Sequence, residues 1–152
     1  MCSINHASTP IYMQDYVWRQ IYQTLGSLPA ETGGVLGASN NVICRFYYDN
    51  DSNSSSVIYR PNAKMIQAVL KNWQTDGISF CGIIHSHARA CDELSFRDIA
   101  FAQAILELNP SLPYVLFPVV IPRSSVTMFQ ITPYIVKEGA IEVGRLCIQQ
   151  NI

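Results

Sequence analysis

Two of the chain's three histidines stand two residues apart, and an aspartate follows them at what the sequence indicates is a helix start. His85 and His87 end an apolar, β-branched run that begins at Ile78, a pattern typical of a strand. Alternate residues of a strand project from the same face, so the two imidazoles can converge on one ion. Asp98 can supply a third ligand, and three protein ligands with a fourth, open position are typical of catalytic zinc. The sequence therefore predicts a zinc site.

The same segment also has a purely structural interpretation. Ser95-x-x-Asp98 is a variant of the helix capping box, and Leu94 with Ile99 is placed as its hydrophobic staple. A pair of histidines on a strand is likewise more often structural than metal-binding. The two interpretations are compatible, because a cap fixes where the helix begins and therefore where Asp98 points. The conjunction of a histidine strand with an acidic helix start favours the metal.

Together these residues resemble the JAMM motif of the JAB/MPN metallopeptidases. The match comprises His85-x-His87, seven residues, Ser95-x-x-Asp98, and the upstream segment Glu-Thr-Gly-Gly-Val-Leu-Gly that starts at Glu31. The resemblance implies a zinc ion bound by His85, His87 and Asp98. It also implies that Glu31 is the general acid/base toward the water that the metal activates, and that Ser95 helps to stabilise the tetrahedral intermediate.

The loop between the second histidine and the serine departs from the family pattern. The family usually has proline after the second histidine and often before the serine, where this chain has Ala88 and Leu94. Neither position supplies a ligand, so the departures concern the conformation of the Ala88–Leu94 loop and the fit of a substrate. Cys91 within this loop could be a nucleophile or a zinc ligand, but an inert thiol is the simpler interpretation.

Glu31 acquires a catalytic interpretation only from its surroundings. A lone glutamate after Leu-Pro-Ala would ordinarily be a solvated loop carboxylate. Three glycines within residues 33–37 permit close backbone approach, and the Val-Leu pair between them indicates the start of a buried strand. A carboxylate held beside a metal-activated water can take its proton and later return it to the leaving amine.

Length and composition predict one domain over residues 1–152, long enough to bury a core. The chain is 49% hydrophobic and only 14% charged, which argues against disorder. A net charge of -1 gives no electrostatic reason to expect nucleic acid. The apolar stretch 114–121 is too short to span a bilayer, and no secretory signal is visible. Five cysteines without C-x-x-C spacing favour reduced thiols, and we therefore expect a cytoplasmic protein.

Strand and helix patterns alternate along the chain, which predicts an α/β fold with a mixed sheet flanked by helices. The expected helices cover residues 11–25, 62–76 and 96–108, and the last of these is apolar enough that we expect it to be covered on more than one side. The expected strands cover residues 33–38, 42–48, 78–87, 113–122 and 126–131. Residues 49–56 predict a solvent loop, and the last twenty residues fit either an edge strand or a short helix. The resemblance implies the cytidine-deaminase-like JAB fold.

The predicted function is that of a zinc-dependent isopeptidase or peptidase. The resemblance implies hydrolysis of the bond after the C-terminal glycine of a ubiquitin-like protein, in a conjugate or a precursor, and an E1-like activating enzyme as a possible partner. One alternative is a RadC-like DNA-repair-associated protein, which carries a similar histidine pair, although the chain lacks basic character. Another is a non-catalytic MPN scaffold; such modules typically lack the ligands, whereas all five motif residues are present here.

Overall fold

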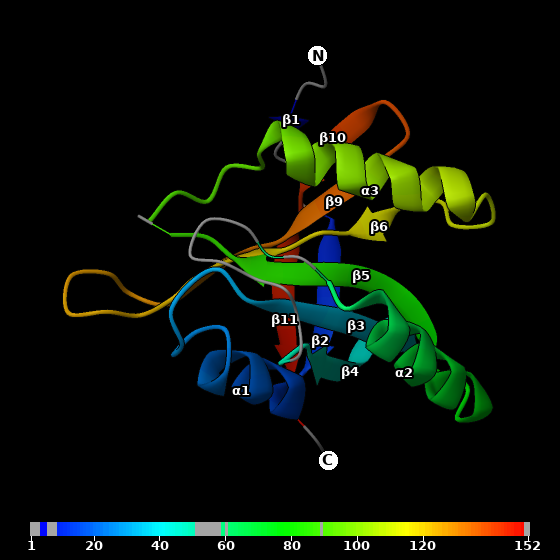
Figure 1. The fold of residues 1–152 in the computed structure, drawn as a ribbon, viewed down its shortest axis with the longest axis horizontal. Helices are drawn as coiled ribbons and strands as arrows, with labels where there is room; N and C mark the ends of the chain where they lie inside the picture. Colours follow the sequence, from blue (N-terminus) through cyan, green and yellow to red (C-terminus); the bar gives the residue numbers. More distant parts are fainter. Residues whose placement is uncertain (1–3, 6–8, 51–58, 60, 89, 151–152) are drawn as a thin grey trace.

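The computed structural model describes residues 4–5, 9–50, 59, 61–88 and 90–150, which form three helices and eleven strands (Figure 1). The helices are α1 (Asp15–Gln23), α2 (Ala63–Thr75) and α3 (Phe96–Leu108). The strands are β1 (Ile4–Asn5), β2 (Pro10–Gln14), β3 (Gly33–Ser39), β4 (Val42–Tyr48), β5 (Ser79–Ser86), β6 (Val115–Leu116), β7 (Val119–Ile121), β8 (Gln130–Thr132), β9 (Tyr134–Lys137), β10 (Ala140–Val143) and β11 (Arg145–Gln149). The predicted α/β class is confirmed.

All eleven strands belong to one mixed sheet, ordered β1-β10-β9-β6-β5-β3-β4-β2-β11, with β7 between the end of β5 and β8. At its centre, β3 runs antiparallel to both β4 and β5, while β6 and β7 run parallel to β5. The centre needs glycine: a Cβ on Gly34 would lie 2.1 Å from the carbonyl oxygen of Tyr47. The predicted close backbone approach of β3 is confirmed.

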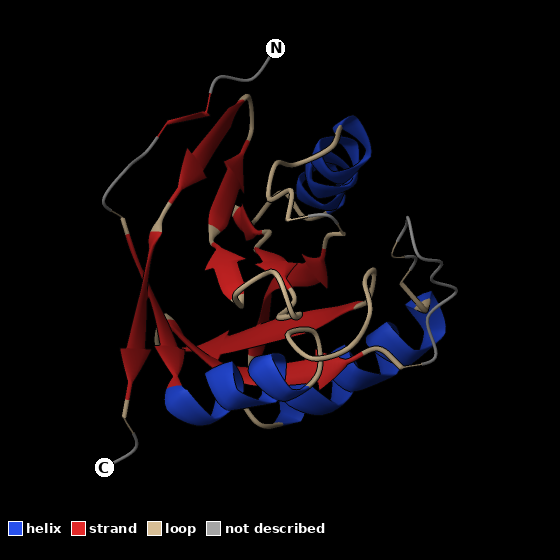
Figure 2. Cartoon of the chain, turned by 90° about the vertical axis from the view of Figure 1, so that its left-hand side faces the viewer, coloured by secondary structure: helices blue, strands red, loops and turns tan. Residues whose placement is uncertain are grey.

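Adjacent residues of the central strands face opposite sides of the sheet, as strand geometry requires. Leu36 and Ile84 pack in the hydrophobic cluster that contains α1, whereas Val35 and Ile83 pack in the cluster that contains residues of α2 and α3. Figure 2 shows α3 well separated from the other two helices. By the same alternation, His85 shares the face of Ile83, so it projects toward the side of α2 and α3.

The first helix is shorter than predicted, because residues 11–14 belong to strand β2. Ile11 and Met13 are buried while Pro10 and Tyr12 are exposed, which is the alternation of a strand rather than of a helix. Strand β2 pairs in parallel with both β4 and β11, and this long-range pairing decides its conformation. The four-residue spacing that predicted one helix crosses the junction between β2 and α1.

The prediction that the third helix is covered on more than one side is wrong. Ala102 is its one fully buried residue, whereas Phe96 is 91% and Leu108 82% exposed. Its buried side rests on β6 and β9. The opposite side carries apolar residues at every fourth position, and these are exposed: Phe96, Ala100, Ala104 and Leu108. Helix α2 is also only partly covered, since none of its residues is fully buried.

The C-terminal third is more finely divided than predicted. The expected strand over 113–122 is split into β6 and β7, and the expected strand over 126–131 begins only at Gln130. Val126 and Met128 instead lie exposed in a turn tied by hydrogen bonds between Ser124 and Thr127. The last twenty residues, for which strand and helix were both open, form β9, β10 and β11. No helix in the described part of the chain is long and apolar enough to cross a membrane.

Candidate metal centre

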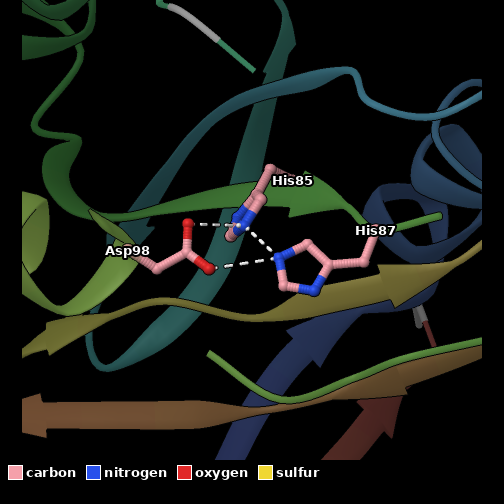
Figure 3. Close-up of side chains that lie close together, drawn as sticks. All are labelled: His85, His87 and Asp98. Atoms are coloured by element: carbon pink, nitrogen blue, oxygen red, sulfur yellow. Dashed lines mark hydrogen bonds and ion pairs between the residues drawn. The ribbon is translucent and has the colours of Figure 1, made fainter. Parts of the chain in front are cut away.

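Three side chains converge where β5 ends and α3 begins (Figure 3). The Nε2 atoms of His85 and His87 lie 2.8 Å apart, and Asp98 places Oδ1 3.2 Å from the first and Oδ2 3.1 Å from the second. In a tetrahedral zinc site with bonds of about 2.0–2.1 Å, ligand atoms lie about 3.3 Å apart. The separations fit such a site after a small opening of the histidine pair. The predicted convergence of these three residues is therefore confirmed, and together they could hold a metal ion.

Strand β7 holds the two histidines in place through their backbones. The His85 amide donates to the carbonyl oxygen of Pro118 at 3.3 Å, and the His87 amide donates to that of Val120 at 2.9 Å. Both imidazoles are buried. The Nδ1 atom of His87 donates to the carbonyl oxygen of Cys91 at 3.0 Å in the tautomer that leaves Nε2 free to bind a metal, whereas Nδ1 of His85 meets no partner among the described residues.

The structure confirms the capping interpretation of the serine–aspartate pair and leaves Asp98 placed to bind a metal. Ser95 is the N-cap of α3: its Oγ accepts the amide of Asp98 at 3.0 Å, and Oδ2 of Asp98 accepts the amide of Ser95 at 2.9 Å. The same Oδ2 faces His87, so the cap aims the carboxylate at the histidines. Within the described part of the chain, the Ser95 hydroxyl acts only as an acceptor, which leaves its proton available for donation.

Glu31 lies beside the histidines because of how β3 pairs with β5. Gly33 is opposite His85 in the sheet register, and Thr32 extends the pairing by exchanging hydrogen bonds with Ser86, the residue between the two histidines. The backbone amide of Tyr59 donates to Oε2 of Glu31 at 3.1 Å. Glu31 is outside the cluster of ligand atoms, which suits a proton acceptor rather than a ligand.

The two carboxylates of the site have opposite pKa shifts. Burial raises the pKa of Glu31, and the neighbouring His87 and His85 offset only part of this effect. Burial acts the same way on Asp98, but hydrogen bonds from both histidines outweigh it and hold the pKa of that carboxyl well below its usual range. Burial would lower the pKa of His87, yet the hydrogen bond and charge of Asp98 raise it. Asp98 is thus suited to ligation and Glu31 to proton transfer.

The sequence did not predict that Tyr59, itself held by Asp49, supports Glu31. Asp49 was expected to open a solvent loop, but it is only 1% exposed, and its Oδ2 accepts the hydroxyl of Tyr59 at 2.9 Å and the amide of Asn62 at 2.8 Å. The expectation is wrong for this residue, because the end of β4 carries it into the protein; residues 51–56 lie outside the described part. The Tyr59 ring covers Gly33, where a Cβ would lie 2.5 Å from it. No local pattern signals this arrangement.

Cys91 contributes its backbone rather than its sulfur to the site. The thiol is free and exposed, and it is not a member of the ligand cluster, whereas its carbonyl oxygen accepts from His87. The inert-thiol interpretation therefore agrees with the structure. Arg89 in the same loop lies outside the described residues.

The sheet and the helices together define a mixed α/β domain, and the ligand cluster lies where β5 ends and α3 begins. The chain is similar in fold to AF2198, a JAB1/MPN domain protein from Archaeoglobus fulgidus, with a TM-score of 0.52 and 14% identity over 94% of this chain and 100% of that one. It is also similar to protein DSY2949 from Desulfitobacterium hafniense, with a TM-score of 0.72 and 14% identity over 99% of this chain and 95% of that one. No family model and no curated protein matches the sequence. At this identity the likeness shows the fold alone.

Proposed function

We propose that this chain is a zinc-dependent peptidase or isopeptidase that hydrolyses the bond after the C-terminal glycine of a ubiquitin-like protein. The observation that carries the proposal is the convergence of His85, His87 and Asp98 on one point, with the carboxylate of Glu31 beside them. The JAB1/MPN fold of AF2198 supports the class of enzyme. The two-nitrogen, one-oxygen donor set supports zinc, which accepts both atom types and keeps an open fourth position in catalytic sites.

A bound zinc ion would supply Lewis acidity, polarising the scissile carbonyl and lowering the pKa of a water to about 7. Glu31 would accept the proton of that water. The backbone amide of Tyr59 holds Oε2 of Glu31, which leaves the other carboxylate oxygen to take the proton. The raised pKa of Glu31 brings it closer to neutrality, which favours the later return of the proton to the leaving amine.

Ser95 stabilises the negative charge that develops on the carbonyl oxygen. Its Oγ is fixed by the amide of Asp98, and its proton is not donated to any described residue, so it can be donated to the substrate. One pre-oriented donor of this kind typically contributes about 10²- to 10³-fold in rate.

The proposed substrate is an extended polypeptide tail. Such a tail can pair its backbone with an exposed sheet edge, and the Ala88–Leu94 loop is placed to shape the entrance to the site. We further propose that the enzyme works in the cytosol, with an E1-like enzyme as a possible partner and without binding nucleic acid or membrane. Free thiols at all four described cysteines are consistent with a reducing compartment.

The test uses a ubiquitin-like protein fused through its C-terminal glycine to a reporter. We expect the zinc-loaded protein to release the reporter after that glycine and a chelator to stop the release. Glu31→Gln should retain zinc and lose about 10²- to 10⁴-fold in turnover, since it removes the proton acceptor and no ligand. Glu107→Gln is the matched control: it neutralises an exposed carboxylate on α3 and should leave turnover unchanged.

A Glu31→Gln protein with near-normal turnover would refute the assigned role. Failure to cleave several ubiquitin-like tails, combined with zinc-dependent cleavage of DNA, would replace the proposal with a RadC-like function. Full zinc occupancy with neither activity would indicate a scaffold.

A further inference from the structure

Asp92, in the loop between His87 and Ser95, accepts three hydrogen bonds from residues of two strands. Oδ2 of Asp92 accepts the hydroxyl of Thr132 at 2.7 Å and the side-chain amide of Gln130 at 3.2 Å, and its carbonyl oxygen accepts the hydroxyl of Tyr134 at 2.9 Å. These donors lie on β8 and β9. Thr132 and Tyr134 are themselves buried, so the groups that hold Asp92 are rigid.

Two neighbours of Asp92, Cys91 and Glu93, are exposed. The Cys91 amide donates to the carbonyl oxygen of Ala88 at 3.4 Å, and Leu94 packs against the cluster that contains residues of α2 and α3. Ala90 has a φ of +54°, a conformation that side chains other than glycine adopt at a cost of about 1–2 kcal/mol. Proline, which fixes φ, is absent at Ala88 and Leu94, so the hydrogen bonds of Asp92 supply a constraint that prolines there would otherwise give.

The contacts of Asp92 bear directly on His87. The peptide bond between Cys91 and Asp92 carries the carbonyl oxygen that accepts from Nδ1 of His87 at 3.0 Å. Holding Asp92 by both its side chain and its own carbonyl fixes the plane of that peptide. A fixed acceptor at Nδ1 favours the proton on that nitrogen, which frees the lone pair of Nε2 for a metal shared with His85 and Asp98.

We propose that Asp92, held by Thr132 and Tyr134, is a positioning residue of the metal centre, which fixes the tautomer and ring orientation of His87 through the Cys91 carbonyl. The inference rests on the metal centre of the proposed function and adds strands β8 and β9 to the structure that supports it. Burial and the charge of Asp92 raise the pKa of Tyr134 to about 12, so its hydroxyl remains a donor at any pH at which the enzyme would work.

The first test measures zinc affinity by competition with a chromogenic chelator. Loss of an outer hydrogen bond to a ligating histidine typically weakens metal binding by about 10- to 100-fold. We expect Asp92→Ala to approach the upper figure and the nearly isosteric Tyr134→Phe and Thr132→Val to lie near the lower one. Asp92→Asn, which keeps one acceptor oxygen, should restore part of the affinity lost in Asp92→Ala.

Tyr16→Phe is the matched control for Tyr134→Phe. The hydroxyl of Tyr16 also donates to a backbone carbonyl, that of Cys44, but it packs against the hydrophobic cluster on the other face of the sheet. We expect this variant to lose thermal stability to a similar degree and to keep the zinc affinity of the wild type. Equal losses of affinity in Tyr134→Phe and Tyr16→Phe would reduce the effect to general destabilisation and overturn the proposal.

A second readout needs no metal. Long-range nitrogen–proton correlation spectra of the metal-free protein, recorded where His87 is neutral, identify which ring nitrogen carries the proton. We expect a larger fraction of the Nδ1–H tautomer in the wild type than in Asp92→Ala and Tyr134→Phe, because the fixed Cys91 carbonyl competes with Asp98 for the single ring proton. This result in a protein that binds no zinc would uphold the positioning role while the proposed function fails. Zinc binding with wild-type affinity and an unchanged tautomer in both variants would overturn the inference and leave the proposed function intact.

Discussion

The two ends of strand β5 differ: one end lines a cavity, and the other leads into the histidines of the metal centre. Its first residues, Ser79–Cys81, line a cavity of about 700 Å³ together with residues of β2, β9 and β10. Its last residues carry the histidines of the metal centre. A well-formed pocket is ordinarily one of the first places to look for an active site. Here the pocket and the ligand cluster lie at opposite ends of one strand.

Three ionisable groups that line the cavity are paired with each other or held neutral. Lys137 and Glu142 pair with each other at 2.8 Å, and burial raises the pKa of the Cys81 thiol to about 12, which keeps it from acting as a nucleophile. At the metal end, the Nε2 atoms of His85 and His87 and the carboxylate of Asp98 face one another, so all three can turn lone pairs to a single ion.

The largest expected effect is the loss of the metal. Elemental analysis of the purified wild type should give about one zinc per chain, and His87→Ala and Asp98→Ala should both be largely empty, because each removes one of three ligands. Cys81→Ala, at the cavity end of the same strand, should keep full occupancy. Full zinc in both ligand variants would contradict the assignment.

The pH dependence of stability should reverse sign when the metal is removed. Zinc at about 100 to 1,000 times its dissociation constant stabilises a protein by about 2.7–4.1 kcal/mol. A ligating histidine must be neutral, so this stabilisation should be lost as pH falls through the raised pKa of His87.

In the metal-free protein, the raised pKa of His87 contributes stability that is full below the unfolded value of about 6.5 and is lost as pH rises through the folded value. The lowered pKa of Asp98 contributes stability that is present above about 3.9. Unfolding curves measured between pH 5 and 8, with zinc and with a chelator, should therefore slope in opposite directions. Parallel curves would show that His87 does not bind the metal.

Strand β3 allows the same substitution at two places, opposite His85 at Gly33 and opposite Phe80 at Gly37. A Cβ on Gly33 would lie 2.5 Å from the Tyr59 ring, and one on Gly37 would lie 2.7 Å from a methyl group of Ile78. Each Gly→Ala variant should lose about 1–3 kcal/mol of unfolding free energy through overpacking. Only Gly33→Ala should also reduce turnover, because it displaces the residue whose amide holds Glu31. Equal turnover in the two variants would show that Tyr59 does not position Glu31.

The smallest expected change in stability separates the two roles of Ser95. Ser95→Ala removes an N-cap worth about 1 kcal/mol, which corresponds to a fall of about 2–4 °C in Tm, whereas Ser95→Gly should cost only a few tenths of a kcal/mol. Both variants lack the hydroxyl, so both should lose turnover to the same extent. If turnover instead follows Tm across the two variants, the hydroxyl serves the helix alone.

The ligands could be predicted because they lie in one continuous segment with a local logic. A strand period places His85 and His87 together, and a capping box places Asp98, so neither step requires knowledge of a distant contact. The residues that support these ligands and Glu31 from outside could not be predicted. Asp49 supports the site through Tyr59 and Gly33, and Asp92 is held by residues from strands much later in the chain. Partners of this kind leave no periodic signal.

The strands and helices divide in the same way, into those that a local pattern predicts and those that depend on distant contacts. Strands β3 and β4 follow directly in the chain and were predicted almost to their ends. Strand β2 was predicted as part of a helix, because its conformation is decided by pairing with the distant strands β4 and β11. Helix α3 has the composition of a buried helix, and the sequence could not show that only one of its sides meets the sheet.

The pairing of β2 with β11 has a consequence for synthesis. The register joins Pro10–Gln14 to Arg145–Gln149, so nearly the whole chain separates the two strands. On the ribosome, β2 emerges long before β11 and must wait for it before that edge of the sheet can close. Contacts between such distant segments slow folding and leave strand edges open to other chains. We expect a nascent chain stopped before β11 to be captured by chaperones, and synthesis of β11 to complete the sheet in one step.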